Sequence, residues 1–138
     1  MNRLILLDTC AALWVMDESK MRQPAMDAID LASSRDEKIY VSPITAWEIG
    51  MLAAKGRFKS NYTPQRWLQL LLSQPGIVLS EMPARMLLES WYLPASQLRD
   101  PWDRIIAATA REYGYTVITR DRALLDYAQQ GHLSAVEC

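Results

Sequence analysis

The sequence has few of the side chains that build soft-metal sites and nucleophilic triads. Its 138 residues include two cysteines, Cys10 and Cys138, and one histidine, His132. The cysteines lie near opposite ends with no paired C-x-x-C spacing, which favours neither a disulfide framework nor a thiolate zinc site. A single imidazole, without a G-x-S-x-G or cysteine context, argues against a Ser/His/Asp or Cys/His triad. Carboxylates remain as the groups available for demanding chemistry.

Long apolar runs are also absent. No run approaches the roughly 20 residues of a membrane helix, and the apolar stretch before Asp8 is too short for a signal peptide. We therefore expect a cytoplasmic protein with no membrane span. Fifty per cent of the residues are apolar and the net charge is only -1, which excludes a disordered chain. Sixteen acidic residues balance fifteen basic ones, so overall charge identifies no partner. The length predicts a single domain over residues 1–138.

Short apolar runs alternate with helical patterns along the chain. Leu4 to Leu7 is purely apolar, as in a strand that is buried on both faces. Further strands are expected at 38–41, 76–79, 115–118 and, as a short last strand, 133–136. Helices are expected at 9–14, 24–34, 43–55, 64–72, 83–90, 101–113 and after Asp121, several of them opened by a capping residue followed by proline. This alternation predicts an α/β fold with a mostly parallel sheet.

Two aspartates follow predicted strands. Asp8 comes directly after the first strand, and Asp121 follows the fourth after Thr119 and Arg120. In an open parallel sheet, ligands bind beyond the carboxyl ends of the strands, so both acids are expected at that edge. The alternative interpretation of each is a helix N-cap, for which Asp is a preferred residue.

Two further acids fall on the apolar faces of predicted helices. Glu48 shares a face with Ile44 and Leu52, and Asp103 shares one with Ile106 and neighbouring alanines. A buried ionised carboxylate must be paired, protonated or bound to a metal. The alternatives are a first-turn acid favoured by the helix dipole for Asp103, and a boundary residue paired with Lys or Arg for Glu48.

Taken together, these four carboxylates indicate one oxygen-only site. Such ligands select hard ions, Mg²⁺ or Mn²⁺, over zinc or copper. Ions held by a few carboxylates keep several waters and suit the activation of water beside a phosphate. Phosphodiester hydrolysis is compatible with this chemistry.

The acids lie in four distinctive segments, which are LLDTCAALW at 6–14, SPITAWEIG at 42–50, DPWDRIIAATA at 100–110 and VITRD at 117–121. In order and spacing these segments resemble the PIN domain, and more narrowly the VapC toxins of bacterial type II toxin–antitoxin pairs. The resemblance covers nearly the whole chain. It implies a three-layer α/β/α sandwich with a central sheet of four or five strands, and a Mg²⁺- or Mn²⁺-dependent endoribonuclease that acts on RNA. It also implies a cognate antitoxin partner and a homodimer.

The resemblance assigns roles position by position. Asp8, Glu48, Asp103 and Asp121 match the family's catalytic, metal-binding acids. Asp100 matches an accessory acid, and Thr9 and Thr119 fit polar positions that orient carboxylates. Candidates for contacts with the RNA backbone, each with ordinary solvated surface as the alternative, are Lys55, Arg57, Lys59, Arg104, Arg120 and Arg122. Trp14, Trp47 and Trp102 are candidates for base stacking or, alternatively, core packing.

Two other classes of function compete with the nuclease. An aspartyl-phosphate phosphotransfer protein would also place an aspartate after the first strand, but the phosphatase motif needs a second Asp two residues on, where this chain has Cys10. A catalytically weak module that acts mainly by binding protein would use apolar helix surfaces around residues 67–72 and 87–93, for which core burial is the alternative.

Overall fold

A five-stranded, wholly parallel sheet forms the centre of the computed structural model, which describes residues 4–17, 21–94 and 97–138. The strands follow the order β3-β2-β1-β4-β5. Their bounds are β1 Leu4–Leu7, β2 Ile39–Val41, β3 Ile77–Leu79, β4 Tyr115–Thr119 and β5 Ser134–Glu137. All five predicted strands are therefore present, each with bounds within one residue of the prediction.

Seven helices connect the strands in the described part of the chain. They are α1 Thr9–Met16, α2 Gln23–Ser34, α3 Pro43–Ala54, α4 Pro64–Ser73, α5 Ala84–Glu89, α6 Pro101–Tyr113 and α7 Arg122–Gln129. The predicted cap-then-proline starts are confirmed: Ser42, Thr63 and Asp100 each accept a hydrogen bond from a backbone N–H of the first turn. No helix in these residues is long and apolar enough to cross a membrane.

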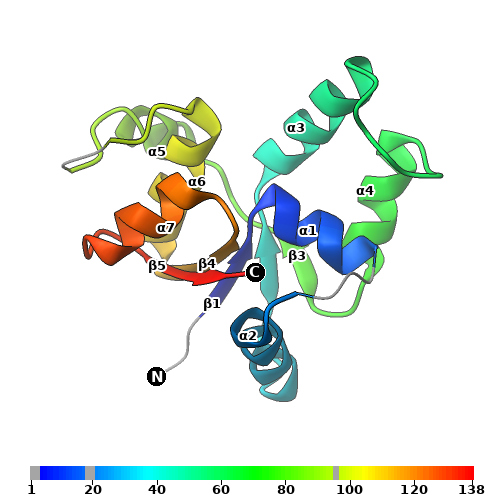
Figure 1. Cartoon of the computed structure of the whole chain (residues 1–138), viewed down its shortest axis with the longest axis horizontal. Coiled ribbons are helices and arrows are strands. Elements are labelled where there is room, and N and C mark those ends of the chain that lie inside the picture. The colour runs from blue at the N-terminus through cyan, green and yellow to red at the C-terminus, as the bar shows by residue number, and fades with distance from the viewer. Residues whose placement is uncertain (1–3, 18–20, 95–96) are drawn as a thin grey trace.

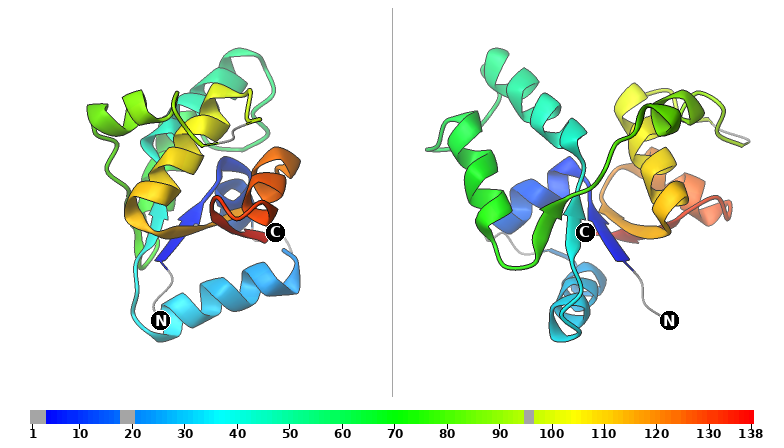
Figure 2. Two further views of the ribbon diagram at one scale, coloured as in Figure 1. Left: turned by 90° about the vertical axis from the view of Figure 1, so that its left-hand side faces the viewer. Right: turned by 180° about the vertical axis from the view of Figure 1, so that it is seen from behind.

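The helices cover both faces of the sheet. Ile5 and Leu7 of β1 pack with α1, α2 and α4, whereas Leu6 between them packs with α6 and α7 on the other face. Figure 1 shows α5, α6 and α7 in the left half of the view with β4 and β5, and α1, α3 and α4 in the right half, and the rear view in Figure 2 shows the same two groups with the sides exchanged. This three-layer arrangement is the predicted α/β/α sandwich.

The strand order reverses beside β1. The chain runs outward from β1 through β2 to β3 and then returns to β4, which pairs with β1 on its other side. In a doubly wound sheet, this reversal is where the loops beyond the carboxyl ends of the strands separate and a ligand site forms. Asp8 follows β1 and Asp121 follows β4, so the topology brings both acids to this position.

Candidate active site

Asp8 is held from two sides at the end of β1. Its Oδ1 accepts a hydrogen bond from the Thr9 N–H at 2.7 Å, which caps α1. Its Oδ2 accepts one from the Thr119 hydroxyl, also at 2.7 Å, and the Cys10 thiol lies 4.0 Å from the same oxygen. The side chain is buried, and this burial raises the pKa of Asp8 against the lowering effect of the hydrogen bonds.

Glu48 of α3 reaches the same region through Thr9. The Thr9 hydroxyl donates to Glu48 Oε1 at 2.8 Å and lies 3.1 Å from the hydroxyl of Thr45, one turn before Glu48 on α3. Burial, with the charges of Asp8 and other nearby acids, raises the pKa of Glu48 to about 7. The hydrogen bond from the Thr9 hydroxyl to Glu48 supports the predicted role of Thr9 in orienting a carboxylate.

Asp103 and Asp121 face each other from α6 and α7. Asp103 lies in the first turn of α6, is 9% exposed and is hydrogen-bonded to Asp121. Burial, followed by the charges of Asp121, Asp100 and Asp8, raises the pKa of Asp103 to about 8. Asp121 caps α7 through Oδ1, which accepts from two backbone N–H groups, and its own N–H donates to the Thr119 hydroxyl at 3.0 Å. Thr119 therefore joins Asp8 to Asp121.

Asp100 lies at the exposed rim of this group. Its Oδ1 accepts from the Trp102 N–H at 2.9 Å and so caps α6. Its charge raises the pKa of Asp8, Glu48 and Asp103, although less than burial does. The structure thus brings together the four predicted acids and the accessory Asp100. We call these five residues the acid cluster.

The acid cluster fits a hard cation by its donor chemistry. All its candidate ligating atoms are carboxylate oxygens. Burial and, after it, mutual repulsion raise the pKa values of Glu48 and Asp103, and a positive charge would relieve that repulsion. Across residues 4–17, 21–94 and 97–138, no three His, Cys, Asp or Glu side chains are already spaced as a set of metal ligands. The carboxylates instead bond to threonine hydroxyls, helix N–H groups and one another.

Comparison with known proteins agrees with this geometry. The sequence model of the PIN domain matches residues 5–130, which is most of the chain. The chain belongs to the PIN domain family. It is also 31% identical over 121 residues to Ribonuclease VapC22 of Mycobacterium tuberculosis, covering 87% of this chain and 88% of that protein, which places it among the VapC proteins of the family.

Solved structures of other proteins have the same fold as this PIN domain. VapBC2 from Rickettsia felis, bound to a DNA fragment from its promoter, matches with a TM-score of 0.69 at 16% identity and covers 97% of this chain and 98% of that one. DNA-bound VapBC from Salmonella typhimurium matches with a TM-score of 0.65 at 18% identity, covering 99% and 98%. The fold is therefore retained where the sequence has diverged widely.

The basic residues predicted to contact the RNA backbone lie in different surroundings. Arg120 lies between Thr119 and Asp121 in the sequence. Its guanidinium carbon is 4.2 Å from the centroid of the Trp14 ring. Arg104 instead donates to the Ser90 carbonyl and lies over the ring of Trp91. Arg122 forms ion pairs with Asp126 and Glu137, and the remaining candidates, Lys55, Arg57 and Lys59, are exposed beyond the end of α3. Arg120 is thus the candidate that stacks on Trp14 of α1 and directly precedes Asp121 in the sequence.

Sequence reasoning did not single out two features of the site. Thr45 is fully buried beside Thr9, and its place three residues before Glu48, on the same helix face, was the available signal. Trp47 and Trp102 pack against each other, with ring centroids 4.3 Å apart. That contact joins two helices distant in the sequence, so no local pattern indicates it.

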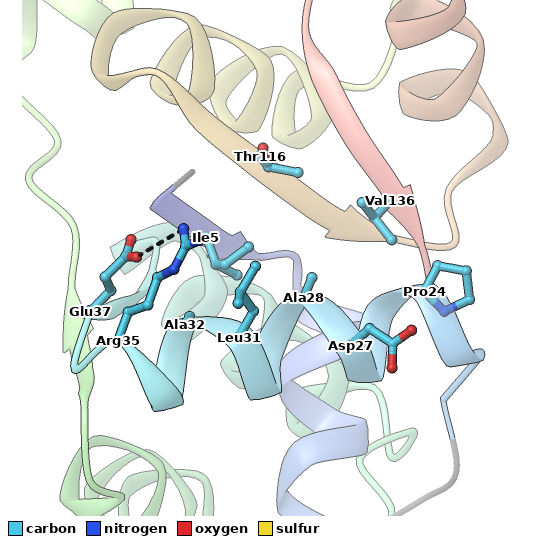
Figure 3. Close-up of a pocket in the computed structure, with 10 residues that line it drawn as sticks. All are labelled: Ile5, Pro24, Asp27, Ala28, Leu31, Ala32, Arg35, Glu37, Thr116 and Val136. Atoms are coloured by element: carbon cyan, nitrogen blue, oxygen red, sulfur yellow. Dashed lines mark ion pairs between the residues drawn. The ribbon is translucent and has the colours of Figure 1, made fainter. Parts of the chain in front are cut away.

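A pocket of about 390 Å³ lies elsewhere, between α2 and the sheet. Figure 3 shows Ala28 and Leu31 of α2 pointing toward Thr116 and Val136 of the sheet. Two of its strand residues, Ile5 and Thr116, lie toward the amino ends of β1 and β4, whereas the acid cluster lies beyond the carboxyl ends of these strands. We therefore place the candidate active site at the acid cluster and not at this pocket.

Proposed function

We propose that the chain is the toxin of a type II toxin–antitoxin pair, a single PIN domain over residues 1–138 that acts in the cytoplasm and hydrolyses phosphodiester bonds of RNA. The main observation behind this proposal is the gathering of acids from separate elements at the point where strand order reverses. The 31% identical relative is named a ribonuclease, which supports the activity. The aspartyl-phosphate alternative has no support from the comparisons.

Asp8, Glu48, Asp103 and Asp121 would hold the cation, Mg²⁺ or Mn²⁺, with Asp100 as an accessory acid. When bound, such an ion lowers the pKa of water, orients it and offsets charge on the phosphate. Its affinity for oxygen ligands agrees with the composition of the acid cluster. Metal dependence is thus part of the proposal, argued from the donor set.

The residues around the acids have positioning roles. Thr119 keeps one oxygen of Asp8 in place while its hydroxyl accepts from the Asp121 N–H. Thr9 orients Glu48 in the same way. Burial and neighbouring acids favour the neutral forms of Glu48 and Asp103, and raise the pKa of Glu48 to about 7 and that of Asp103 to about 8. Arg120, stacked on Trp14, is the residue we assign to a phosphate of the RNA backbone.

We also propose an antitoxin partner and a homodimer. Two of the structural relatives are VapBC assemblies, which supports a VapB-type partner for this chain. Leu88, Trp91 and Tyr92 are exposed by 69%, 62% and 85%, as is typical of a protein contact surface. The prediction of a second apolar contact surface at residues 67–72 is wrong for Trp67 and Leu71, because both side chains are buried in the core.

An RNA cleavage assay tests the proposed function. The purified chain, incubated with labelled single-stranded RNA and Mg²⁺ or Mn²⁺, should cut the RNA, and excess chelator should stop the reaction. Asp8→Asn and Asp103→Asn should abolish cleavage while the protein remains folded, because each removes a charged ligand but keeps the side-chain shape. Full cleavage by either variant would contradict the assignment. No cleavage by the parent with either ion would favour the binding-module alternative.

A further inference from the structure

Two tryptophans lie next to the two helix-borne acids of the cluster. Trp47 directly precedes Glu48 in α3, and Trp102 directly precedes Asp103 in α6. Their rings pack at 4.3 Å between centroids with 48° between the planes. The aromatic contact therefore joins α3 and α6 at the residues that directly precede Glu48 and Asp103.

The two rings differ in their surroundings. Trp102 is half-buried and packs against the hydrophobic core on the α6 side of the sheet. Trp47 is 52% exposed, whereas the core tryptophan Trp67 is only 1% exposed. Core packing thus accounts for Trp67 and in part for Trp102, but it leaves half of the Trp47 side chain in water.

Accordingly, we propose that Trp47 is a stacking platform for a nucleobase of single-stranded RNA beside the phosphate that is cut, with Trp102 supporting its ring. This inference rests on the proposed function. Aromatic rings bind unpaired bases through their faces with little regard to sequence. A base inside a duplex is already stacked and paired on both sides, so a platform at this position selects unpaired nucleotides.

Because the acid cluster is negatively charged, RNA affinity at this site benefits from a contact that does not depend on charge, such as base stacking. The chain has a net charge of -1, and the acid cluster repels the phosphate backbone wherever no cation is bound. Arg120, which stacks on Trp14 and directly precedes Asp121 in the sequence, is the basic group that we assign to a backbone phosphate. Phosphate contacts weaken steeply as salt rises, whereas stacking on Trp47 persists, so the two contributions are separable by salt dependence.

The test measures binding of fluorescein-labelled single-stranded RNA of mixed sequence to full-length protein with Asp8→Asn in chelator, so that neither cleavage nor ion binding differs between the compared variants. In that background, Trp47→Leu should weaken binding by roughly 5- to 100-fold, the range that corresponds to loss of one stacked base. Trp47→Phe should restore most of the affinity because it keeps a ring. Tyr62→Leu is the matched control, because Tyr62 is also an exposed aromatic side chain, at 49%, but lies between α3 and α4, away from the Trp47–Trp102 contact.

Two further measurements separate stacking from a structural effect. The slope of log affinity against log salt should be the same for Trp47→Leu and its parent, because no phosphate contact is removed. A sugar-phosphate probe of the same length without bases should bind both proteins equally. Thermal melting of each variant confirms that the compared proteins are folded.

Several outcomes would overturn the stacking site. They are unchanged RNA binding by Trp47→Leu, equal loss with Trp47→Phe, or an equal penalty on the probe without bases. Loss of antitoxin binding with RNA binding intact would assign Trp47 to a protein contact instead, which also overturns the proposal. If the parent cuts no RNA but binding still depends on the Trp47 ring, the nuclease proposal fails and the nucleobase site stands.

Discussion

Three aspartates of the acid cluster each serve a helix as well as the site. Asp8, Asp100 and Asp121 accept backbone N–H bonds that begin α1, α6 and α7. The N-cap and active-site interpretations of these residues are therefore compatible, since a carboxylate has two oxygens. The positive ends of the helix dipoles also favour negative charge at these positions. Local capping preferences thus help to gather the acids that the site needs.

Thr119 is the residue whose hydroxyl links two of the acids. Thr119→Val removes the donor to Asp8 and the acceptor for the Asp121 N–H in a fully buried position of similar shape. We expect cleavage to fall by about 10- to 100-fold, as for other residues that orient metal ligands, and stability to fall by about 1–3 kcal/mol.

Thr119→Ser is the control, because it retains the hydroxyl. It should keep most of the activity, as measured by RNA cleavage rates and thermal melting of both variants. Equal activity of the valine and serine variants would show that the hydroxyl has no positioning role.

The raised pKa of Asp103 predicts how stability depends on pH. The folded protein has a pKa of about 8 for this group, against about 3.9 for an unfolded aspartate. The folded state therefore binds the proton more tightly, and the stability gained from protonation is present at low pH and lost as pH rises toward 8. In chelator, the melting temperature of the parent should fall between about pH 4 and pH 8 and level off above that range.

Asp103→Asn should reduce this fall, because an amide does not titrate. We expect the variant to melt roughly 3–8 °C above the parent at about pH 9 and to differ less at about pH 5. Differential scanning calorimetry across pH measures both effects. An identical pH dependence in parent and variant would contradict the assigned pKa and the repulsion behind it.

At the scale of elements, the sequence allowed prediction of most of the fold. Apolar runs of three to five residues indicated the strands, and capping residues followed by proline indicated where α3, α4 and α6 begin. Parallel pairing followed from the alternation of strands and helices. The strand order did not, because it depends on which helix packs on which face of the sheet.

The parts of the site that escaped prediction all depend on tertiary packing. The acids were recognisable because each lies at a strand end or on an apolar helix face, and burial of a carboxylate requires a reason. The contact of Trp47 with Trp102, and the turning of Arg104 toward Ser90, depend on how α3, α5 and α6 are placed. No periodicity within one helix contains that information.

Alanine substitutions at two glycines, Gly114 and Gly50, should change the free energy of unfolding in opposite directions. Gly114 ends α6 in the left-handed conformation at φ 71°, whereas Gly50 lies exposed within α3. A methyl group added at either position would meet no atom within 4 Å. Gly114→Ala should lower the free energy of unfolding by about 1 kcal/mol through backbone strain. Gly50→Ala should raise it by about 0.5–1 kcal/mol through helix propensity.

Chemical denaturation of the two alanine variants provides the comparison. Because both sites have room for a methyl group, a difference in sign isolates the backbone contribution. A stabilised Gly114→Ala variant would show that the end of α6 differs from the one described.

At the scale of the whole molecule, we expect the chain to associate with other chains. The exposed apolar side chains of Leu88, Trp91 and Tyr92 lie in and after α5. Co-expression with a short open reading frame adjacent to the gene should yield a complex that purifies together and cuts RNA less than the free chain. The free chain should run as a dimer in light scattering. A monomer that binds no adjacent gene product would contradict the toxin–antitoxin assignment.

The most direct test of the central claim is a crystal structure with Mn²⁺ and its anomalous difference map. We predict a strong peak at the carboxyl ends of β1 and β4, in direct contact with carboxylate oxygens of the acid cluster. The peak should include Asp8 and Asp103 among its ligands and should vanish in Asp8→Asn crystals. A map with no peak there at saturating Mn²⁺, or with its only peaks elsewhere, would contradict the claim that these acids form a cation site.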